Sequence, residues 1–199
     1  MKQRGKIKER IIRVLLNEPA GKLTKYGLAK KAECSFPWVH EFLNKLENQG
    51  LVKGTEVRNY AGLIDHWLSV KLKPEKREYM LKRPLDLLRG TVLRYALTTY
   101  HAENLVQHYL FPSRVDLYVL EEDTEQWHQL ITANGLVGGG NVRLLIADSH
   151  VLYGSFKREG LNVVSIPQLI VDLFDEGGVC IEAAEQLLER VTKDALRTT

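Results

Sequence analysis

Residues 34–53 read CSFPWVHEFLNKLENQGLVK, and this stretch decides the fold predicted for the first part of the chain. Ser35 can cap a helix, and Pro37 fits its first turn, because a missing N–H there removes no helical hydrogen bond. Gly50 is the type of residue that ends a helix, and residues 51–53 then read as a short strand. The apolar positions of the predicted helix form one stripe: Val39, Phe42, Leu43 and Leu46.

Two more helices are predicted upstream of this stretch. Residues 3–16 place apolar side chains at helical spacing, and Thr24 is a suitable N-cap for a short helix at 25–32. Downstream, the alternation of residues 67–72 predicts a second strand, which leaves 54–66 as a polar, hairpin-like loop. The predicted order is helix, short helix, capped helix, strand, loop, strand.

That order and the residues 34–53 resemble the recognition helix and first wing strand of winged-helix transcription factors. The resemblance covers about the first 72 residues and implies double-stranded DNA as a partner, since a major groove admits one helix. We expect the third helix to read base edges, lysines to contact phosphates and Arg58 to enter the minor groove. The predicted DNA-binding residues are Lys25, Lys30, Lys31, Ser35, Pro37, Trp38, His40, Asn44, Lys45, Lys53 and Arg58.

Other interpretations of this module stay open. Trp38 can equally be a packing residue, and His40 can be a solvated side chain without a role. The same fold also serves as a protein-interaction module, for which the mark would be an apolar outer face on the third helix. The mixture of Pro37 and Trp38 with His40, Asn44 and Lys45 leaves that alternative open.

The charge of the chain is distributed unevenly. Residues 1–83 hold 19 Lys and Arg against 9 Asp and Glu, a net charge of +10, whereas 84–199 hold 9 against 16, a net charge of −7. A basic module of this size is typical of a nucleic-acid binder. Five cations around Pro74 predict a charged linker at 73–83, which separates a first domain at 1–72 from a second at 84–199.

The second domain is predicted to interleave helices and strands. A long helical region is expected at 84–110, followed by strands and helices in alternation. The predicted strands are 114–120, 142–147 and 162–164, and the predicted helices are 126–133, 165–174 and 181–196. The fold class expected for the whole chain is therefore α+β, with a mixed α/β second domain.

This half resembles the C-terminal domain of AbiEi-type antitoxins and related transcriptional regulators of viral defence systems. The resemblance rests on YALTT at 95–99 with Ala102, VDLYV at 115–119, VSIPQL at 164–169 with Asp172 and Leu173, and AAEQLL at 183–188. It implies a prokaryotic winged-helix repressor with a nucleotidyltransferase-like second domain, which represses its own operon beside a toxin gene. The partners that it implies, besides DNA, are a second copy of the chain and a toxin protein.

Catalysis is not expected from this domain. An active nucleotidyltransferase needs a Gly-Ser turn and an Asp-x-Asp pair, because two carboxylates hold the metals that bind the triphosphate. Here Thr98 and Thr99 stand at the turn, and Asp116 has no second carboxylate two residues later. We therefore predict no enzyme activity, no cofactor and no metal site. The alternative is a nucleotidyltransferase in which Asp148 or Glu121 completes the pair with Asp116.

The remaining features indicate a cytoplasmic protein. Cys34 and Cys180 lie in different halves and form neither a disulfide framework nor a metal-ligand cluster. The chain has no apolar run of the roughly 20 residues that a membrane span needs, and no secretion signal. The acidic residues at the end of the helix that begins at 165 are expected to be solvated: Asp172, Asp175 and Glu176.

Overall fold

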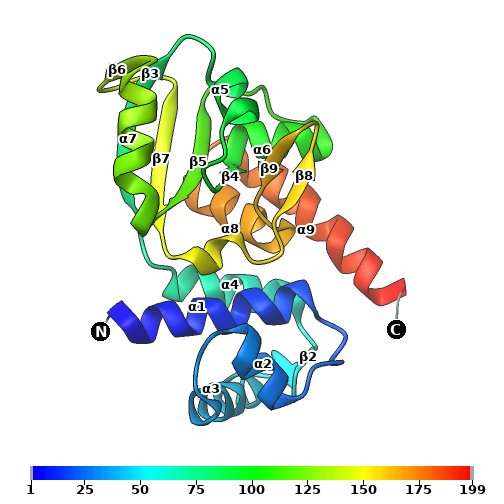
Figure 1. The fold of residues 1–199 in the computed structure, drawn as a ribbon. Helices are drawn as coiled ribbons and strands as arrows, with labels where there is room; N and C mark the ends of the chain where they lie inside the picture. Colours follow the sequence, from blue (N-terminus) through cyan, green and yellow to red (C-terminus); the bar gives the residue numbers. More distant parts are fainter. Residues whose placement is uncertain (1, 198–199) are drawn as a thin grey trace. The chain divides into compact units, whose positions relative to one another are not determined.

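The computed structural model describes residues 2–197, with side chains described for 4–193. Met1, Thr198 and Thr199, which the predicted domains include, lie outside the described residues. The fold is α+β, as predicted, and it divides into two compact units (Figure 1). The first unit comprises 1–72, 166–175 and 184–199, and the second comprises 73–165 and 176–183. The units therefore differ from the predicted domains, because two C-terminal segments belong with the N-terminal one.

The first three helices of the first unit lie where they were predicted. They are α1 (Lys2–Asn17), α2 (Lys25–Lys31) and α3 (Phe36–Asn48). The Thr24 side chain caps α2 by accepting the backbone N–H of Gly27 at 2.9 Å. Ser35 takes the extended N-cap conformation at α3 without a side-chain cap bond. The apolar stripe of α3 is buried, which holds the opposite face of the helix outward.

The second predicted strand of this unit is wrong. The short strands β1 (Val52–Lys53) and β2 (Glu56–Val57) form a tight hairpin, and α4 (Tyr60–Val70) follows at once. The Asn59 side chain caps α4 by accepting the N–H of Gly62 at 2.8 Å. The buried residues of α4 recur at helical spacing and outweigh the short alternation read at 67–72: Tyr60, Leu63, Ile64 and Trp67.

The C-terminal helices α8 (Ile166–Glu176) and α9 (Cys180–Arg197) contribute most of their residues to the first unit. The guanidinium of Arg13 donates from Nε to Gln168 Oε1 at 3.0 Å, and Gln168 Nε2 donates to Asp172 Oδ1 at 3.0 Å. Lys71 Nζ lies 2.9 Å from both Asp172 Oδ1 and Asp175 Oδ2. The expectation that Asp172 is solvated is wrong, because this carboxylate is buried and paired with Lys71.

The described residues of the second unit form one mixed seven-stranded sheet in the order β6-β3-β7-β5-β4-β9-β8. Parallel pairs join β5 to β7 and β4 to β9, and the other neighbours are antiparallel. The strands are β3 (Glu75–Leu81), β4 (Tyr95–Thr98), β5 (Val115–Leu120), β6 (Gly135–Val137), β7 (Val142–Ala147), β8 (Phe156–Arg158) and β9 (Leu161–Val163).

Among the described residues of the second unit, three α-helices lie between these strands along the chain. The helices are α5 (Pro84–Gly90), α6 (Thr99–Gln107), which packs on β4 and β5, and α7 (Thr124–Thr132), which packs on β5 and β6. Residues 73–83 were expected to be a solvated linker, but β3 pairs with β6 and β7 inside the sheet, and its Tyr79 and Leu81 side chains are buried. The helical region expected at 84–110 is interrupted by the fully buried strand β4.

Within the described residues, no helix combines the length and the apolar character that crossing a membrane requires.

Candidate functional site

The outward face at α3 carries five of the eleven residues predicted to contact DNA. Ser35, Pro37, His40, Asn44 and Lys45 are all exposed on it. Among the described residues of the first unit, these side chains are therefore open to solvent.

Three side chains of this face form a row along the helix. The ring of Phe36, which is 45% exposed, stacks on the His40 ring with centroids 6.2 Å apart and planes inclined by 10°. His40 Nε2 lies 3.4 Å from Asn44 Nδ2. We call Phe36, His40 and Asn44 the α3 row; their spacing of four residues places them on one line of the helix surface. Phe36 was missed as a contact residue, although its position four residues before His40 was visible in the sequence.

Trp38 lies beside the α3 row rather than in it. Its side chain is half-buried, and the guanidinium carbon of Arg4 lies 5.7 Å from the ring centroid. This cation–π contact ties the start of α1 to α3. The packing interpretation of Trp38 therefore has direct structural support, and only part of the ring is open to a partner.

The cations predicted to contact DNA fall into two groups. Lys30 and Lys53 are exposed, and neither has an ion-pair partner among the described residues; Lys25 is half-buried. The other three are paired with carboxylates: Lys31 with Glu18 at 2.6 Å, Lys45 with Glu41 at 2.6 Å and Arg58 with Glu56 at 2.8 Å. Exposed pairs of this kind contribute only about 0–1 kcal/mol, so a phosphate can compete for these cations. Arg58 lies beside the hairpin at the start of α4, not at the tip of a loop.

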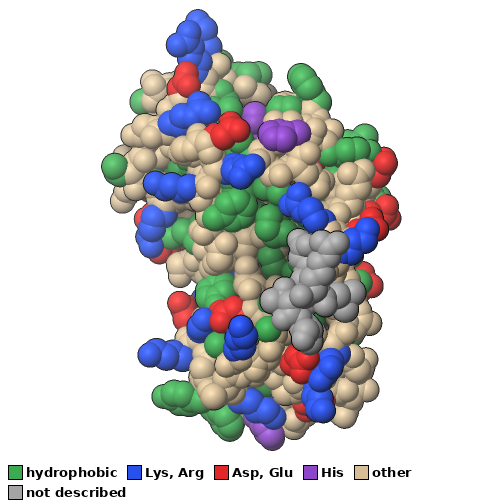
Figure 2. Space-filling view, turned by 90° about the vertical axis from the view of Figure 1, so that its right-hand side faces the viewer, with side chains coloured by type: hydrophobic (Ala, Val, Ile, Leu, Met, Phe, Trp, Pro, Cys, Tyr) green, Lys and Arg blue, Asp and Glu red, His purple; other side chains and the backbone are tan. Residues whose placement is uncertain are grey.

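One exposed aromatic residue near these lysines was also missed. Tyr26 on α2 is 72% exposed and lies four residues before Lys30, on the same line of the helix. Basic side chains are interspersed with acidic ones on the face that Figure 2 presents, rather than gathered into one patch. That face of the molecule therefore shows no uniformly positive surface.

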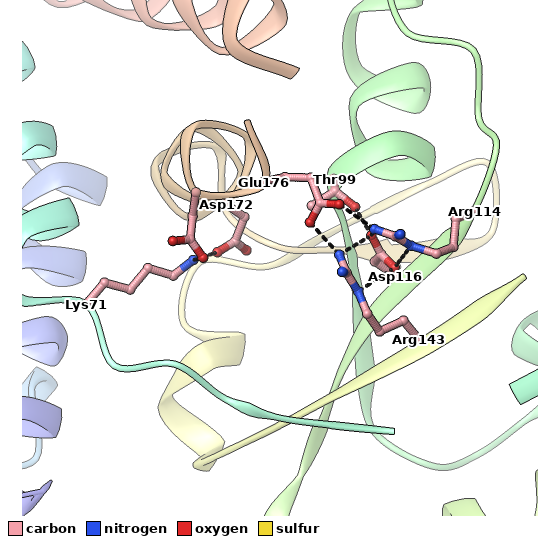
Figure 3. Close-up of polar contacts among 8 residues, drawn as sticks. Lys71, Thr99, Arg114, Asp116, Arg143, Asp172 and Glu176 are labelled. Atoms are coloured by element: carbon pink, nitrogen blue, oxygen red, sulfur yellow. Dashed lines mark hydrogen bonds and ion pairs between the residues drawn. The ribbon is translucent and has the colours of Figure 1, made fainter. Parts of the chain in front are cut away.

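The second unit holds a buried ion cluster around Asp116 (Figure 3). Asp116 lies on β5 and its side chain is 0% exposed. It accepts hydrogen bonds from Thr99 Oγ1 at 2.5 Å, from Arg114 Nε at 2.7 Å and Nη2 at 2.9 Å, and from Arg143 Nε at 3.1 Å and Nη2 at 2.9 Å. We call Thr99, Arg114, Asp116, Arg143 and Glu176 the Asp116 cluster. Both carboxylate oxygens of Asp116 are thus occupied by donors.

Glu176 completes this cluster from the end of α8. Arg114 Nη2 donates to its Oε1 and Arg143 Nη2 to its Oε2, each at 2.6 Å. Burial alone would raise the pKa of Glu176, but the hydrogen bonds from Arg143 and Arg114 hold it below its usual value. The hydrogen bonds to Asp116 raise the pKa of Arg114. The expectation that Glu176 is solvated is therefore wrong.

The geometry around Asp116 differs from a two-carboxylate metal site. In the sheet, Asp116 stands beside Arg143 of β7, so a cation occupies the neighbouring position. Glu121 directly follows β5 and Asp148 directly follows β7, at the ends of these strands that lie away from Asp116. Each lies five residues beyond the level of Asp116, which is about 16 Å along the strand at roughly 3.3 Å per residue. The structure thus brings neither alternative carboxylate to Asp116. The described residues contain no group of three or more His, Cys, Asp or Glu side chains placed to hold a metal ion.

Comparisons of this chain with protein-family models, with curated proteins and with solved structures found no match.

Proposed function

We propose that this chain is a double-stranded-DNA-binding transcriptional regulator of the antitoxin-like type, which represses its own operon through a winged-helix variant formed by the first unit. The observation that carries the proposal is the α3 row, an exposed line of hydrogen-bonding and aromatic side chains. Lys30 and Lys53 supply exposed, unpaired positive charge among the described residues of the same module.

The side chains of the α3 row suit the edges of base pairs in the major groove. The amide of Asn44 can pair with an adenine through one donor and one acceptor, and His40 can donate or accept one hydrogen bond. The Phe36 ring offers apolar contact to a thymine methyl group. Lys30 and Lys53 would contact phosphates and so contribute affinity without sequence preference.

The proposal gives the second unit no catalytic role. Asp116 is saturated by Thr99, Arg114 and Arg143, which leaves no oxygen for a metal ion without breaking these bonds. The nucleotidyltransferase alternative therefore has no observation in its favour. We assign the formation of a dimer to the second unit, because winged-helix regulators commonly bind repeated half-sites as dimers. A toxin protein is the further partner that we propose.

Salt-dependent binding to the DNA upstream of the protein's own gene tests the proposal. For a B-DNA binder, the slope of log affinity against log salt is about −0.9 per phosphate neutralised. We expect Lys30→Ala and Lys53→Ala each to weaken binding to all sequences and to make the slope shallower by about 1. Lys157→Ala is the matched control, because this exposed lysine lies on β8 of the second unit.

Substitution in the α3 row should act on specificity instead. Asn44→Ala is expected to reduce the discrimination between operator and unrelated DNA by about 1–3 kcal/mol, the typical value of one bidentate base contact. Fluorescence anisotropy with operator and scrambled duplexes measures both quantities. Binding that is undetectable at about 50 mM salt, or that does not respond to salt, contradicts the proposal. An Asn44→Ala effect that is equal on all duplexes contradicts the assigned orientation of α3.

A further inference from the structure

The Asp116 cluster contains two guanidinium groups that converge on one point. Arg114 and Arg143 each bind Asp116 through both Nε and Nη2, so each side chain is fixed by two hydrogen bonds. Each then directs its Nη2 at a different oxygen of Glu176, at 2.6 Å (Figure 3). Because Asp116 alone holds both arginines, the pair keeps its geometry if the Glu176 carboxylate leaves.

Glu176 is the member of the cluster that can leave. Its side chain is 18% exposed, whereas that of Asp116 is 0% exposed. It stands on the last residue of α8, and Gly177 and Gly178 follow with φ of 77° and 55°. These left-handed positions are open to glycine without strain, and nothing lies within 4 Å of where a Cβ would stand on either residue. Rotation of the Glu176 side chain at this corner would expose the two Nη2 groups.

The cluster is also costly to build. Burying two ion pairs gives little net stability, and apolar residues of the same volume are often at least as stable. Thr99, which donates to Asp116, has a φ of 48°, a left-handed conformation that is strained for a branched residue. Strain and buried charge of this kind are characteristic of binding and switching sites.

We propose that the Arg114–Arg143 pair is a binding site for the carboxylate group of a small organic acid, with Glu176 as its internal competitor. Without Glu176 the two arginines and Asp116 carry a net charge of +1, which one carboxylate neutralises. A carboxylate also reproduces the two coplanar oxygens that Glu176 presents, one to each guanidinium. The Tyr100 ring, 5.3 Å from the Arg114 guanidinium carbon, bounds the site on one side. This inference does not depend on DNA binding.

The test opens the site by Glu176→Ala and uses propionate, a small organic carboxylate one carbon longer than the CH2–COO⁻ group that the substitution removes. Isothermal titration calorimetry should show binding of propionate to the variant and none of propionamide, its neutral isostere. The unaltered chain should bind propionate at least tenfold more weakly, because Glu176 occupies the arginines. Glu125→Ala, an exposed position on α7 of the same unit, should behave like the unaltered chain.

Several outcomes overturn the proposal. These are no propionate binding to Glu176→Ala, equal binding of propionamide, or binding that persists in Glu176→Ala with Arg114→Gln. Tighter binding of inorganic phosphate than of propionate overturns the assignment to a carboxylate. Should Glu176→Ala fail to fold, NMR of the arginine Nε–H signals in the unaltered chain decides. Shifts of the Arg114 and Arg143 signals with about 100 mM propionate support the site, and unchanged signals refute it.

Discussion

Replacing Lys71 by Met should destabilise the first unit strongly. The Lys71 side chain is 8% exposed and its Nζ lies 2.9 Å from Asp172 Oδ1; the Asp172 side chain is only 3% exposed. Burial lowers the pKa of Lys71, but the charges and hydrogen bonds of Asp172 and Asp175 together outweigh this effect and raise it, so the ammonium stays charged. Lys71→Met leaves the Asp172 carboxylate buried without this cation. Removal of one partner from a buried pair costs about 3–5 kcal/mol.

Removing both charges should recover part of that loss. Replacement of a buried ion pair by apolar residues is often neutral or stabilising. In Lys71→Met with Asp172→Leu, Gln168 Nε2 loses its acceptor, which costs about 1–3 kcal/mol. We therefore expect the double variant to lie closer to the unaltered chain than the Lys71→Met single variant does. Lys193→Met is the matched control, because Lys193 forms an exposed pair with Glu189 at 2.5 Å and such pairs contribute about 0–1 kcal/mol.

Thermal unfolding followed by circular dichroism measures these differences. At about 2–4 °C per kcal/mol for a chain of this size, Lys71→Met should lower the Tm by about 6–20 °C. The control should change the Tm by no more than about 4 °C. A Lys71→Met variant that unfolds within about 2 °C of the unaltered chain refutes the reasoning, as does a double variant that is less stable than the single one.

Two further predictions concern the unit boundary and the Asp116 cluster. A fragment of residues 1–72 lacks α8 and therefore lacks Gln168 and Asp172, the partners of Arg13 and Lys71. It should show weaker near-UV circular dichroism and a lower Tm than the full chain. Equal stability would contradict the assignment of α8 to the first unit. The pKa of Glu176 lies below its ordinary 4.5, because its bonds to Arg143 and Arg114 outweigh the effect of burial. The contribution of Glu176 to stability is therefore fully present above pH 4.5 and is lost as the pH falls through the lower pKa of the folded state. The deficit of Glu176→Gln relative to the unaltered chain in urea unfolding should therefore be larger at about pH 6 than at about pH 3, and a deficit that does not change with pH would refute the pairing.

Local signals in the sequence predicted the first three helices correctly. The apolar stripe of α3, the Thr24 cap of α2 and the Gly50 stop each act within one or two turns of helix. The strand β5 was recognisable for the same reason, since its branched and aromatic residues all lie within six positions. Such features depend on neighbours along the chain, which a single sequence displays directly.

The missed elements depend on partners that are far away in the sequence. Strand β3 is charged along most of its length, and only its pairing with β7, more than sixty residues later, places it in the sheet. In the Asp116 cluster, Arg114 and Glu176 are 62 residues apart, and Arg143 and Asp116 are 27 residues apart. The sequence near Asp116 therefore contains no signal for Arg143 or Glu176 as its neighbours. The helix α4 is a different case, because the cap residue Asn59 and the apolar spacing after it were visible and were read as a loop.

The two units also change how the charge of the chain should be interpreted. Counted by unit rather than by sequence half, the first unit holds 17 Lys and Arg against 12 Asp and Glu, a net charge of +5, and the second holds 11 against 13, a net charge of −2. The contrast of +10 and −7 is therefore reduced, partly because the acidic residues Asp172 and Asp175 belong to the first unit. Asp172 is buried against Lys71 and adds little field at the surface. Under the proposed function, affinity for DNA would come from individually placed cations such as Lys30 and Lys53. Single lysine substitutions should then have a larger relative effect than they would on a uniformly basic domain.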